Sequence, residues 1–163
     1  VLEINVENAF LYEAIHEISR NATVAAGGII SAQQADRAVD AGAQIISSPI
    51  FQMNMVKISK DKEIPLIACA STPNEAYTAW KTRIPLIKIY PANALGGVMY
   101  VEDLLRLMPF LNVMPSGNIL LEEVPAYIKA GAVAVGVGRG FYQDSNLSKI
   151  TKKAKHIIEK LKG

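Results

Sequence analysis

Short segments rich in β-forming residues alternate with longer amphipathic segments along this chain, and this alternation constrains the fold more than any other feature. The pattern is typical of βα units, in which helices connect and cover parallel strands. We expect strands over residues 1–6, 23–28, 44–48, 65–69, 86–90, 113–116 and 132–136. We expect helices over residues 9–20, 32–41, 52–60, 73–81, 101–107, 121–130 and 145–161.

The ends of several predicted helices carry the residues that such ends prefer. Thr72 and Ser145 are good N-caps, and Gly42 and Gly131 stand where a left-handed residue commonly ends a helix. Consecutive βα units with no switch in pattern favour an α/β fold of the (β/α)8 TIM-barrel type over an open doubly wound sheet. Because Val1 already lies within a strand-like run, we expect that the first βα unit is missing from the chain.

Length and composition predict a single domain over residues 1–163. The chain is 50% hydrophobic and 20% charged, which is ordinary for a globular core. No apolar stretch approaches the roughly 18 residues needed to cross a bilayer, so we expect no membrane association. The single cysteine, Cys69, fits a reducing cytoplasm. The basic residues 152–156 are expected to form a solvated helix face and not a nucleic-acid-binding surface.

Lys88 is the one charged residue in the apolar run 84–91, which is typical of a fully buried strand. Burial of an ammonium group costs several kcal/mol unless it is paired, and it favours the neutral amine. A neutral amine is a nucleophile that forms imines with carbonyl substrates. Glu3 interrupts its own strand in the same way and offers a carboxylate for proton transfer. The alternative is structural: a buried ion pair, or two side chains that snorkel at the barrel mouth.

The last two predicted strands end in small residues. Gly117 and Asn118 follow one strand, and Gly138 and Arg139 follow the next. Backbone N–H groups at such ends can converge on an anion, and barrels often hold a phosphate there. Arg139 can add a bidentate contact. We predict a phosphate site at these four residues, with ordinary tight loops as the alternative.

Other chemically capable residues are expected to have structural roles. His16 and His156 are isolated, so we predict surface or packing roles and no metal site. Cys69 ends a strand and can line the barrel mouth, but we favour a small buried hydrophobe. Tyr77 and Trp80 share a helix at i, i+3 spacing and are expected to pack.

A set of short segments occurs along the chain in the order typical of a known enzyme family. They are VLEI at 1–4, AGAQ at 41–44, SP at 48–49, IPLI at 64–67, IKIYPA at 87–92, LGG at 95–97, MPSG at 114–117, AGA at 130–132 and GVG at 136–138. Together they resemble the 2-keto-3-deoxy-6-phosphogluconate (KDPG)/4-hydroxy-2-oxoglutarate (KHG) aldolase family, class I enzymes on a (β/α)8 barrel. The resemblance covers nearly the whole chain, and the lysine strand followed by Pro-Ala and Gly-Gly is its most specific part.

The resemblance implies a function and a set of site residues. Lys88 matches the Schiff-base lysine and Glu3 the proton-transfer glutamate, while Ser116 and Pro49 fall at substrate-binding positions. The family cleaves KDPG to pyruvate and glyceraldehyde 3-phosphate in the Entner–Doudoroff pathway. It uses no metal or other cofactor and usually forms a homotrimer. The implied partner is a small 2-keto acid or phosphosugar.

Four positions depart from the family pattern. Glu7 replaces an arginine that holds the pyruvate carboxylate, and Gly28 replaces a threonine that shares this carboxylate. Asn118 replaces a phosphate-loop glycine, and Arg139 stands where serine is common. Loss of a charge-assisted contact costs about 1.5–3 kcal/mol, and Glu7 adds repulsion. Two alternatives therefore stay open: a phosphosugar-binding barrel without aldolase activity, and a phosphate-binding isomerase or epimerase in which Lys88 acts electrostatically.

Overall fold

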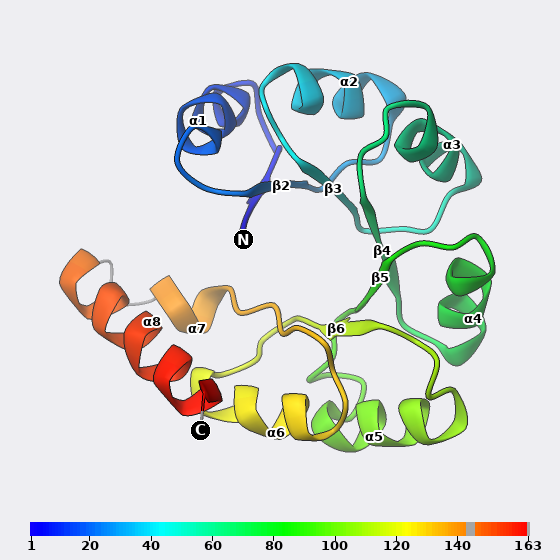
Figure 1. Ribbon diagram of the computed structural model, residues 1–163, viewed down its shortest axis with the longest axis vertical. Coiled ribbons are helices and arrows are strands. Elements are labelled where there is room, and N and C mark those ends of the chain that lie inside the picture. Colours follow the sequence, from blue (N-terminus) through cyan, green and yellow to red (C-terminus); the bar gives the residue numbers. More distant parts are fainter. Residues whose placement is uncertain (143–145, 163) are drawn as a thin grey trace. The chain divides into compact units, whose positions relative to one another are not determined.

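The computed structural model describes residues 1–142 and 146–162. The chain divides into two compact units, Val1–Ile87 and Lys88–Gly163. It has an α/β fold with six strands that are neighbours in sequence order, β1 to β6, and helices that alternate with them (Figure 1).

The first unit consists of regular βα units. Its strands β1 to β4 are parallel, with Glu3 opposite Ala25 and Ile46 opposite Leu66. Its elements are β1 (Leu2–Asn5), α1 (Phe10–Ser19), β2 (Val24–Gly27), α2 (Ala32–Asp40), β3 (Ile45–Ser48), α3 (Met53–Asp61), β4 (Leu66–Ala70) and α4 (Pro73–Lys81). Figure 1 shows α1 to α4 on one side of these strands. Side chains alternate along a strand, so Glu3 and Asn5 share one face of β1.

The second unit begins within β5 (Leu86–Ile89). It continues with α5 (Gly97–Leu107), β6 (Val113–Pro115), the 3₁₀ helix η1 (Leu121–Glu123), α6 (Val124–Lys129), α7 (Arg139–Tyr142) and α8 (Leu147–Lys162). Beyond α6 the chain returns alongside β6. The Val133 N–H donates to the Val113 carbonyl at 3.1 Å, and the Gly136 N–H donates to the Pro115 carbonyl at 2.8 Å.

The predicted seventh strand is wrong. Residues 132–136 form no strand, and only Gly136 makes an isolated parallel bridge, to Ser116. A Cβ at Gly136 would lie 2.6 Å from the Ser116 Oγ, so close approach at this bridge requires glycine. The described strands therefore number six, each confirmed to within about two residues of its expected end.

The helices differ from expectation at three places. α5 begins at Gly97, four residues before the expected start, because Gly96 takes a φ of +119° as its N-cap. The segment expected as one helix over 121–130 divides into η1 and α6, and the short α7 was not expected. Ser145, the expected N-cap of the last helix, lies outside the described residues.

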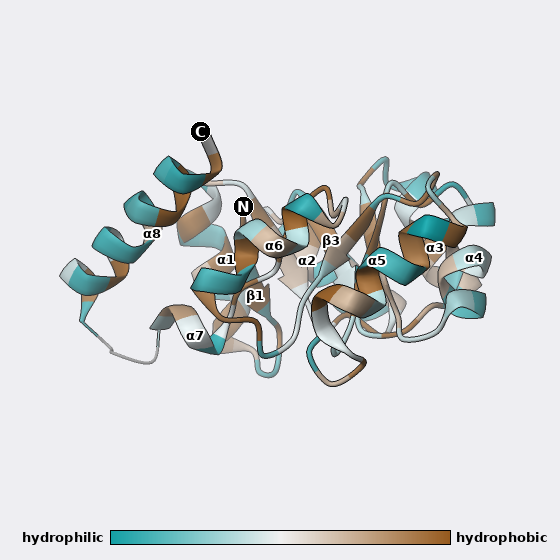
Figure 2. Cartoon of the chain, turned by 90° about the horizontal axis from the view of Figure 1, so that it is seen from below, coloured by the Kyte–Doolittle hydropathy of each residue, from teal (hydrophilic) through white to brown (hydrophobic). Residues whose placement is uncertain are grey.

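Helix α8 is amphipathic, as the basic run at 152–156 predicted. Figure 2 shows hydrophilic residues along one side of α8 and hydrophobic residues along the other. Ile150, Ala154 and Ile157 are half-buried, whereas Lys152 and Lys155 are exposed. Within residues 1–142 and 146–162, no helix combines the length and apolarity that crossing a membrane requires.

Candidate active site

Lys88 is a buried lysine in the middle of strand β5. Its neighbours Ile87 and Ile89 are apolar and β-branched, so the segment forms a strand that packs on both faces. Lys88 is only 6% exposed, which confirms the expected burial. Lysine is rarely buried to this degree unless its amine has a chemical or pairing role.

Ser116 lies beside the end of this strand. The Ser116 N–H donates to the Ile89 carbonyl at 2.9 Å, and the Ala92 N–H donates to the Ser116 carbonyl at 2.8 Å. Ser116 directly follows β6, so these bonds hold the end of β6 against the end of β5. The second unit thus brings a residue with a hydroxyl group next to the end of the strand that carries the buried Lys88.

The four predicted phosphate-binding residues lie on two adjacent loops of the second unit. Because Ser116 is bridged to Gly136, the loops that start at Gly117 and Gly138 follow neighbouring chain segments. Arg139 is exposed at the start of α7, and a Cβ at Gly138 would meet no atom within 4 Å. Backbone N–H groups beside a guanidinium and open space suit an oxyanion.

Gly117 is held closely against the end of β5. Its φ is +104°, and a Cβ would lie 2.9 Å from the Pro91 Cα and 3.0 Å from the Tyr90 ring. Asn118 follows with a φ of +56°, a left-handed conformation that asparagine tolerates better than most residues. The substitution of asparagine for the glycine that the family resemblance aligns here is therefore compatible with the loop.

Glu3 is exposed on β1 in the first unit, with Ser47 and Gly27 on one side of its carboxylate. The Ser47 Oγ donates to the Glu3 Oε1 at 3.3 Å, and Ser47 is only 1% exposed. A Cβ at Gly27 would lie 2.8 Å from the same Oε1. The sequence analysis did not predict Ser47 as a site residue. Ser47 is a polar residue directly after the apolar residues 45–46 of a strand, and a polar residue in a strand was the signal that identified Glu3 and Lys88.

The remaining predicted binding residues also belong to the first unit. Glu7 is exposed just after β1, and its N–H donates to the Asn5 carbonyl at 3.0 Å. Gly28 follows β2 with a φ of +73°, a conformation that glycine adopts without strain. Pro49 follows β3 and lines a cavity.

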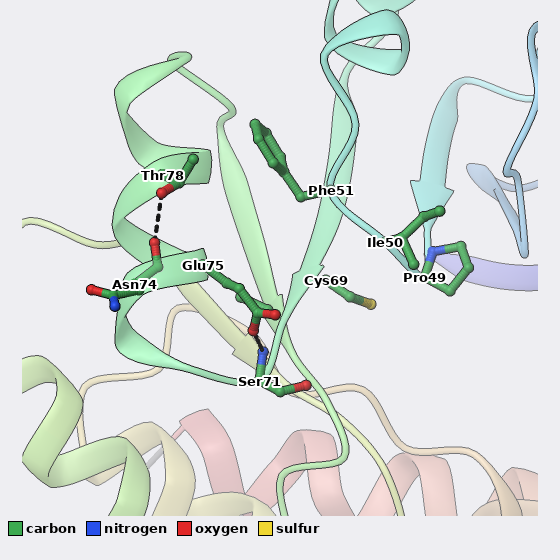
Figure 3. A pocket seen from close by; sticks show the side chains of 9 residues that line it. Pro49, Ile50, Phe51, Cys69, Ser71, Asn74, Glu75 and Thr78 are labelled. Atoms are coloured by element: carbon green, nitrogen blue, oxygen red, sulfur yellow. Dashed lines mark hydrogen bonds between the residues drawn. The ribbon is translucent and has the colours of Figure 1, made fainter.

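That cavity of about 540 Å³ lies at the ends of β3 and β4 and beside α4 (Figure 3). Its lining comprises Pro49, Ile50, Phe51, Cys69, Ala70, Ser71, Asn74, Glu75 and Thr78. Cys69 is half-buried and lines the cavity, so the favoured interpretation of a small buried hydrophobe is wrong. The cavity mixes apolar walls with a carboxylate, an amide and hydroxyls.

Glu75 does not extend freely into this cavity, because it caps the start of α4. Its Oε2 accepts from the Ser71 and Thr72 backbone N–H groups, each at 2.8 Å, and Thr72 completes a capping box. The hydrogen bond from the Ser71 N–H, followed by those from Thr72, lowers the pKa of the Glu75 carboxyl.

The residues expected to have structural roles are placed accordingly. The rings of Tyr77 and Trp80 stack with centroids 5.8 Å apart. His16 is exposed, with its Nε2 2.9 Å from the Arg20 Nη2, and His156 is exposed on α8. Among the described residues, no three His, Cys, Asp or Glu side chains gather as metal ligands.

The chain resembles known proteins along nearly its whole length. Residues 1–159 match the sequence model of a family described as KDPG and KHG aldolase. The chain is 28% identical over 170 residues to the 2-dehydro-3-deoxy-phosphogluconate aldolase of Haemophilus influenzae, covering 99% of this chain and 80% of that protein. It is 27% identical over 167 residues to the KHG/KDPG aldolase of Escherichia coli K12, covering 98% and 78%.

A solved structure shows the same fold. It is a KDPG aldolase from Legionella pneumophila with pyruvate captured at low pH as a covalent carbinolamine intermediate. It superposes with a TM-score of 0.84 at 22% identity, covering 96% of this chain and 80% of that chain.

Proposed function

The chain belongs to the KDPG and KHG aldolase family, and we propose that it is a class I aldolase that reversibly cleaves a 2-keto-3-deoxy (phospho)sugar acid. The products are pyruvate and an aldehyde, such as glyceraldehyde 3-phosphate when the substrate is KDPG. The observation that carries this proposal is the burial of Lys88, 6% exposed, on the strand that contains the family's most specific segment. A buried amine suits imine formation with a ketone.

The proposed reaction begins at the C2 ketone of the substrate. The lone pair of the Lys88 Nζ attacks C2 to give a carbinolamine, which loses water to give an iminium ion. A base takes the proton of the C4 hydroxyl, the C3–C4 bond breaks, and its electron pair moves to C3 to give an enamine and an aldehyde. Protonation at C3 and addition of water then release pyruvate and regenerate the amine.

Glu3 is the proposed general acid/base for these proton transfers. The hydrogen bond from the buried Ser47 Oγ at 3.3 Å supports this role, because it orients the carboxylate. Ser116 is a proposed substrate-binding residue, supported by its place beside the end of the strand that carries Lys88. Gly28, Pro49 and Glu7 are the remaining proposed contacts to the sugar acid.

The aldehyde half of the substrate is proposed to carry a phosphate at Gly117, Asn118, Gly138 and Arg139. Their adjacent loops and the exposed guanidinium support this assignment. Glu7 is a poor partner for a carboxylate, and Arg139 is a candidate to replace the missing positive charge.

We further propose that residues 1–163 belong to one domain with a (β/α)8 barrel and that the enzyme is a cytoplasmic homotrimer. The six strands in sequence order and the fold shared with solved KDPG aldolases support the barrel. The partner is a small 2-keto acid or phosphosugar, not a nucleic acid or a membrane.

Borohydride trapping tests the proposal. The protein is incubated with pyruvate and sodium borohydride, and we expect mass spectrometry to show a reduced adduct on a Lys88 peptide. Lys88→Met removes the amine and should abolish the adduct, whereas Lys129→Met, which changes an exposed lysine on α6, should retain it. Absence of an adduct with pyruvate and with KDPG would exclude Schiff-base catalysis.

Glu7 favours a second candidate function, a phosphosugar-binding protein without aldolase activity. A carboxylate at the position where the family resemblance expects a carboxylate-binding arginine disfavours a 2-keto acid. This function predicts calorimetric binding of a sugar phosphate with no pyruvate adduct and no cleavage.

A further inference from the structure

We propose that Asn93 is a positioning residue that fixes the loop after β6 and thereby sets the affinity for the phosphate end of the substrate. This inference rests on the proposed function. Asn93 lies four residues beyond the β5 terminus at Ile89, in the loop that follows Lys88 and not in either predicted phosphate loop. It is exposed, so a change at this position leaves the packed core intact.

Asn93 and its neighbour bind three successive carbonyl groups of the phosphate loop. The Ala92 N–H donates to the Ser116 carbonyl at 2.8 Å, and the Asn93 N–H donates to the Gly117 carbonyl at 3.5 Å. The Asn93 Nδ2 donates to the Asn118 carbonyl at 3.0 Å. The side-chain bond is the shorter of the two that Asn93 makes, and it alone depends on the identity of the residue.

The direction of these carbonyls determines the direction of the neighbouring N–H groups. The loop peptides are trans, because the one cis bond of the described chain is Tyr90–Pro91. In a trans peptide the C=O and the N–H of the next residue point in opposite directions. With the carbonyls of residues 116–118 turned toward Asn93, the N–H groups of Gly117, Asn118 and Ile119 point away from it.

The Gly117 N–H follows Ser116 directly and so lies on the side of the segment that is bridged through Gly136. Successive N–H groups on one side of left-handed residues form a concave site for an anion. Gly117 and Asn118 both have positive φ values, +104° and +56°. Asparagine tolerates a left-handed conformation but also adopts others, so the Asn93 amide supplies an interaction that favours this one at Asn118.

Inorganic phosphate is the probe for this role. Its dissociation constant is measured by calorimetry, and its inhibition constant is measured in the KDPG cleavage assay. Asn93→Leu removes the donor with little change in size and adds no charge, and we expect phosphate to bind about two- to tenfold more weakly, the size of one neutral hydrogen bond. Asn93→Gln keeps an amide donor and should recover part of the affinity. Pyruvate trapping should be unchanged in both variants, because pyruvate carries no phosphate.

Asn21→Leu is the matched control, since Asn21 is an exposed asparagine after α1 in the first unit. Equal phosphate affinity in wild type, Asn93→Leu and Asn21→Leu would overturn the inference, as would failure of wild type to bind phosphate. An equal fall in phosphate affinity and in pyruvate trapping would overturn it too, because that result indicates general disruption. Failure of the proposed aldolase function gives a different result, because wild type then forms no pyruvate adduct. Calorimetry would still compare the phosphate affinities of wild type and the Asn93 variants and so test the role of Asn93 separately.

Discussion

Substitution of Gly27 by alanine tests whether catalysis depends on the position of the Glu3 carboxylate beside Gly27. Gly27 lies on β2 with a φ outside the left-handed region, so the backbone accepts alanine. The added Cβ would nevertheless contact the Asn5 Oδ1, and it would lie 2.8 Å from the Glu3 Oε1 and 3.0 Å from the Glu3 Cγ. The perturbation is therefore steric and directed at two side chains.

The size of the displacement follows from these distances. An ordinary contact needs at least 3.4 Å, so the Glu3 Oε1 must move by about 0.6 Å. The hydrogen bond from the Ser47 Oγ is already 3.3 Å long, and a move away from Ser47 would break it. Overpacking of a core costs about 1–3 kcal/mol of stability, and the cost here is smaller because the contacted atoms belong mainly to the ends of two exposed side chains. A misplacement of this order can lower kcat by about ten- to a hundredfold.

The assay couples pyruvate release from KDPG to lactate dehydrogenase and reports kcat, while urea unfolding reports stability. Gly42→Ala is the control, because its Cβ would lie 2.6 Å from the Ser19 Oγ and so strains the first unit through a contact with Ser19. We expect both variants to lose stability and only Gly27→Ala to lose kcat beyond the loss in the control. Unchanged kcat in a folded Gly27→Ala protein would refute a proton-transfer role for Glu3.

Two further predictions concern α4 and the phosphate loops. The pKa of Glu75 is lowered in the folded protein, so its hydrogen bonds contribute stability above the ordinary carboxyl pKa of 4.5, and this contribution is lost as the pH falls through the lower folded-state value. Urea unfolding across this pH range should show Glu75→Gln to be less stable than wild type at neutral pH, with a difference that shrinks toward low pH; a constant difference would contradict the linkage. Gly138→Ala adds a methyl group to open space, so thermal unfolding should stay within about 0.5 kcal/mol of wild type. In Gly138→Ala the KM for KDPG should rise more than the KM for the same acid without its phosphate. If the ratio of these two KM values equals that of wild type, Gly138 does not belong to the phosphate site.

The alternating pattern of the chain predicted six of the seven expected strands because short β-rich runs and capped amphipathic runs are local signals. Thr72 begins α4 and Gly42 follows the end of α2 as expected, since caps depend on adjacent residues. Residues 132–136 misled the prediction, because their small apolar residues permit a strand but the ladder depends on the distant Ser116. Local pattern does not encode that long-range contact.

The residues of the candidate site also divide into those that the local sequence predicts and those that it does not. Burial of Lys88 followed from a charge inside an apolar run. Ser47 interrupts a similar run but carries no charge, so it gave a weaker signal and was missed. The link between Asn93 and Asn118 spans 25 residues and joins two loops, where no periodicity relates the partners.

The backbone at Gly28 restricts how this chain can change over evolutionary time. A threonine, which the family resemblance aligns here, would have to adopt the φ of +73° at a cost of about 1–2 kcal/mol, and a β-branched side chain is an outlier in that region. Replacement of Gly28 by threonine would therefore strain the turn while it supplied a hydroxyl. A threonine fits here only if the turn between β2 and α2 relaxes to a negative φ. The backbone conformation at Gly28, and not only the size of the side chain, thus decides which residues this position accepts.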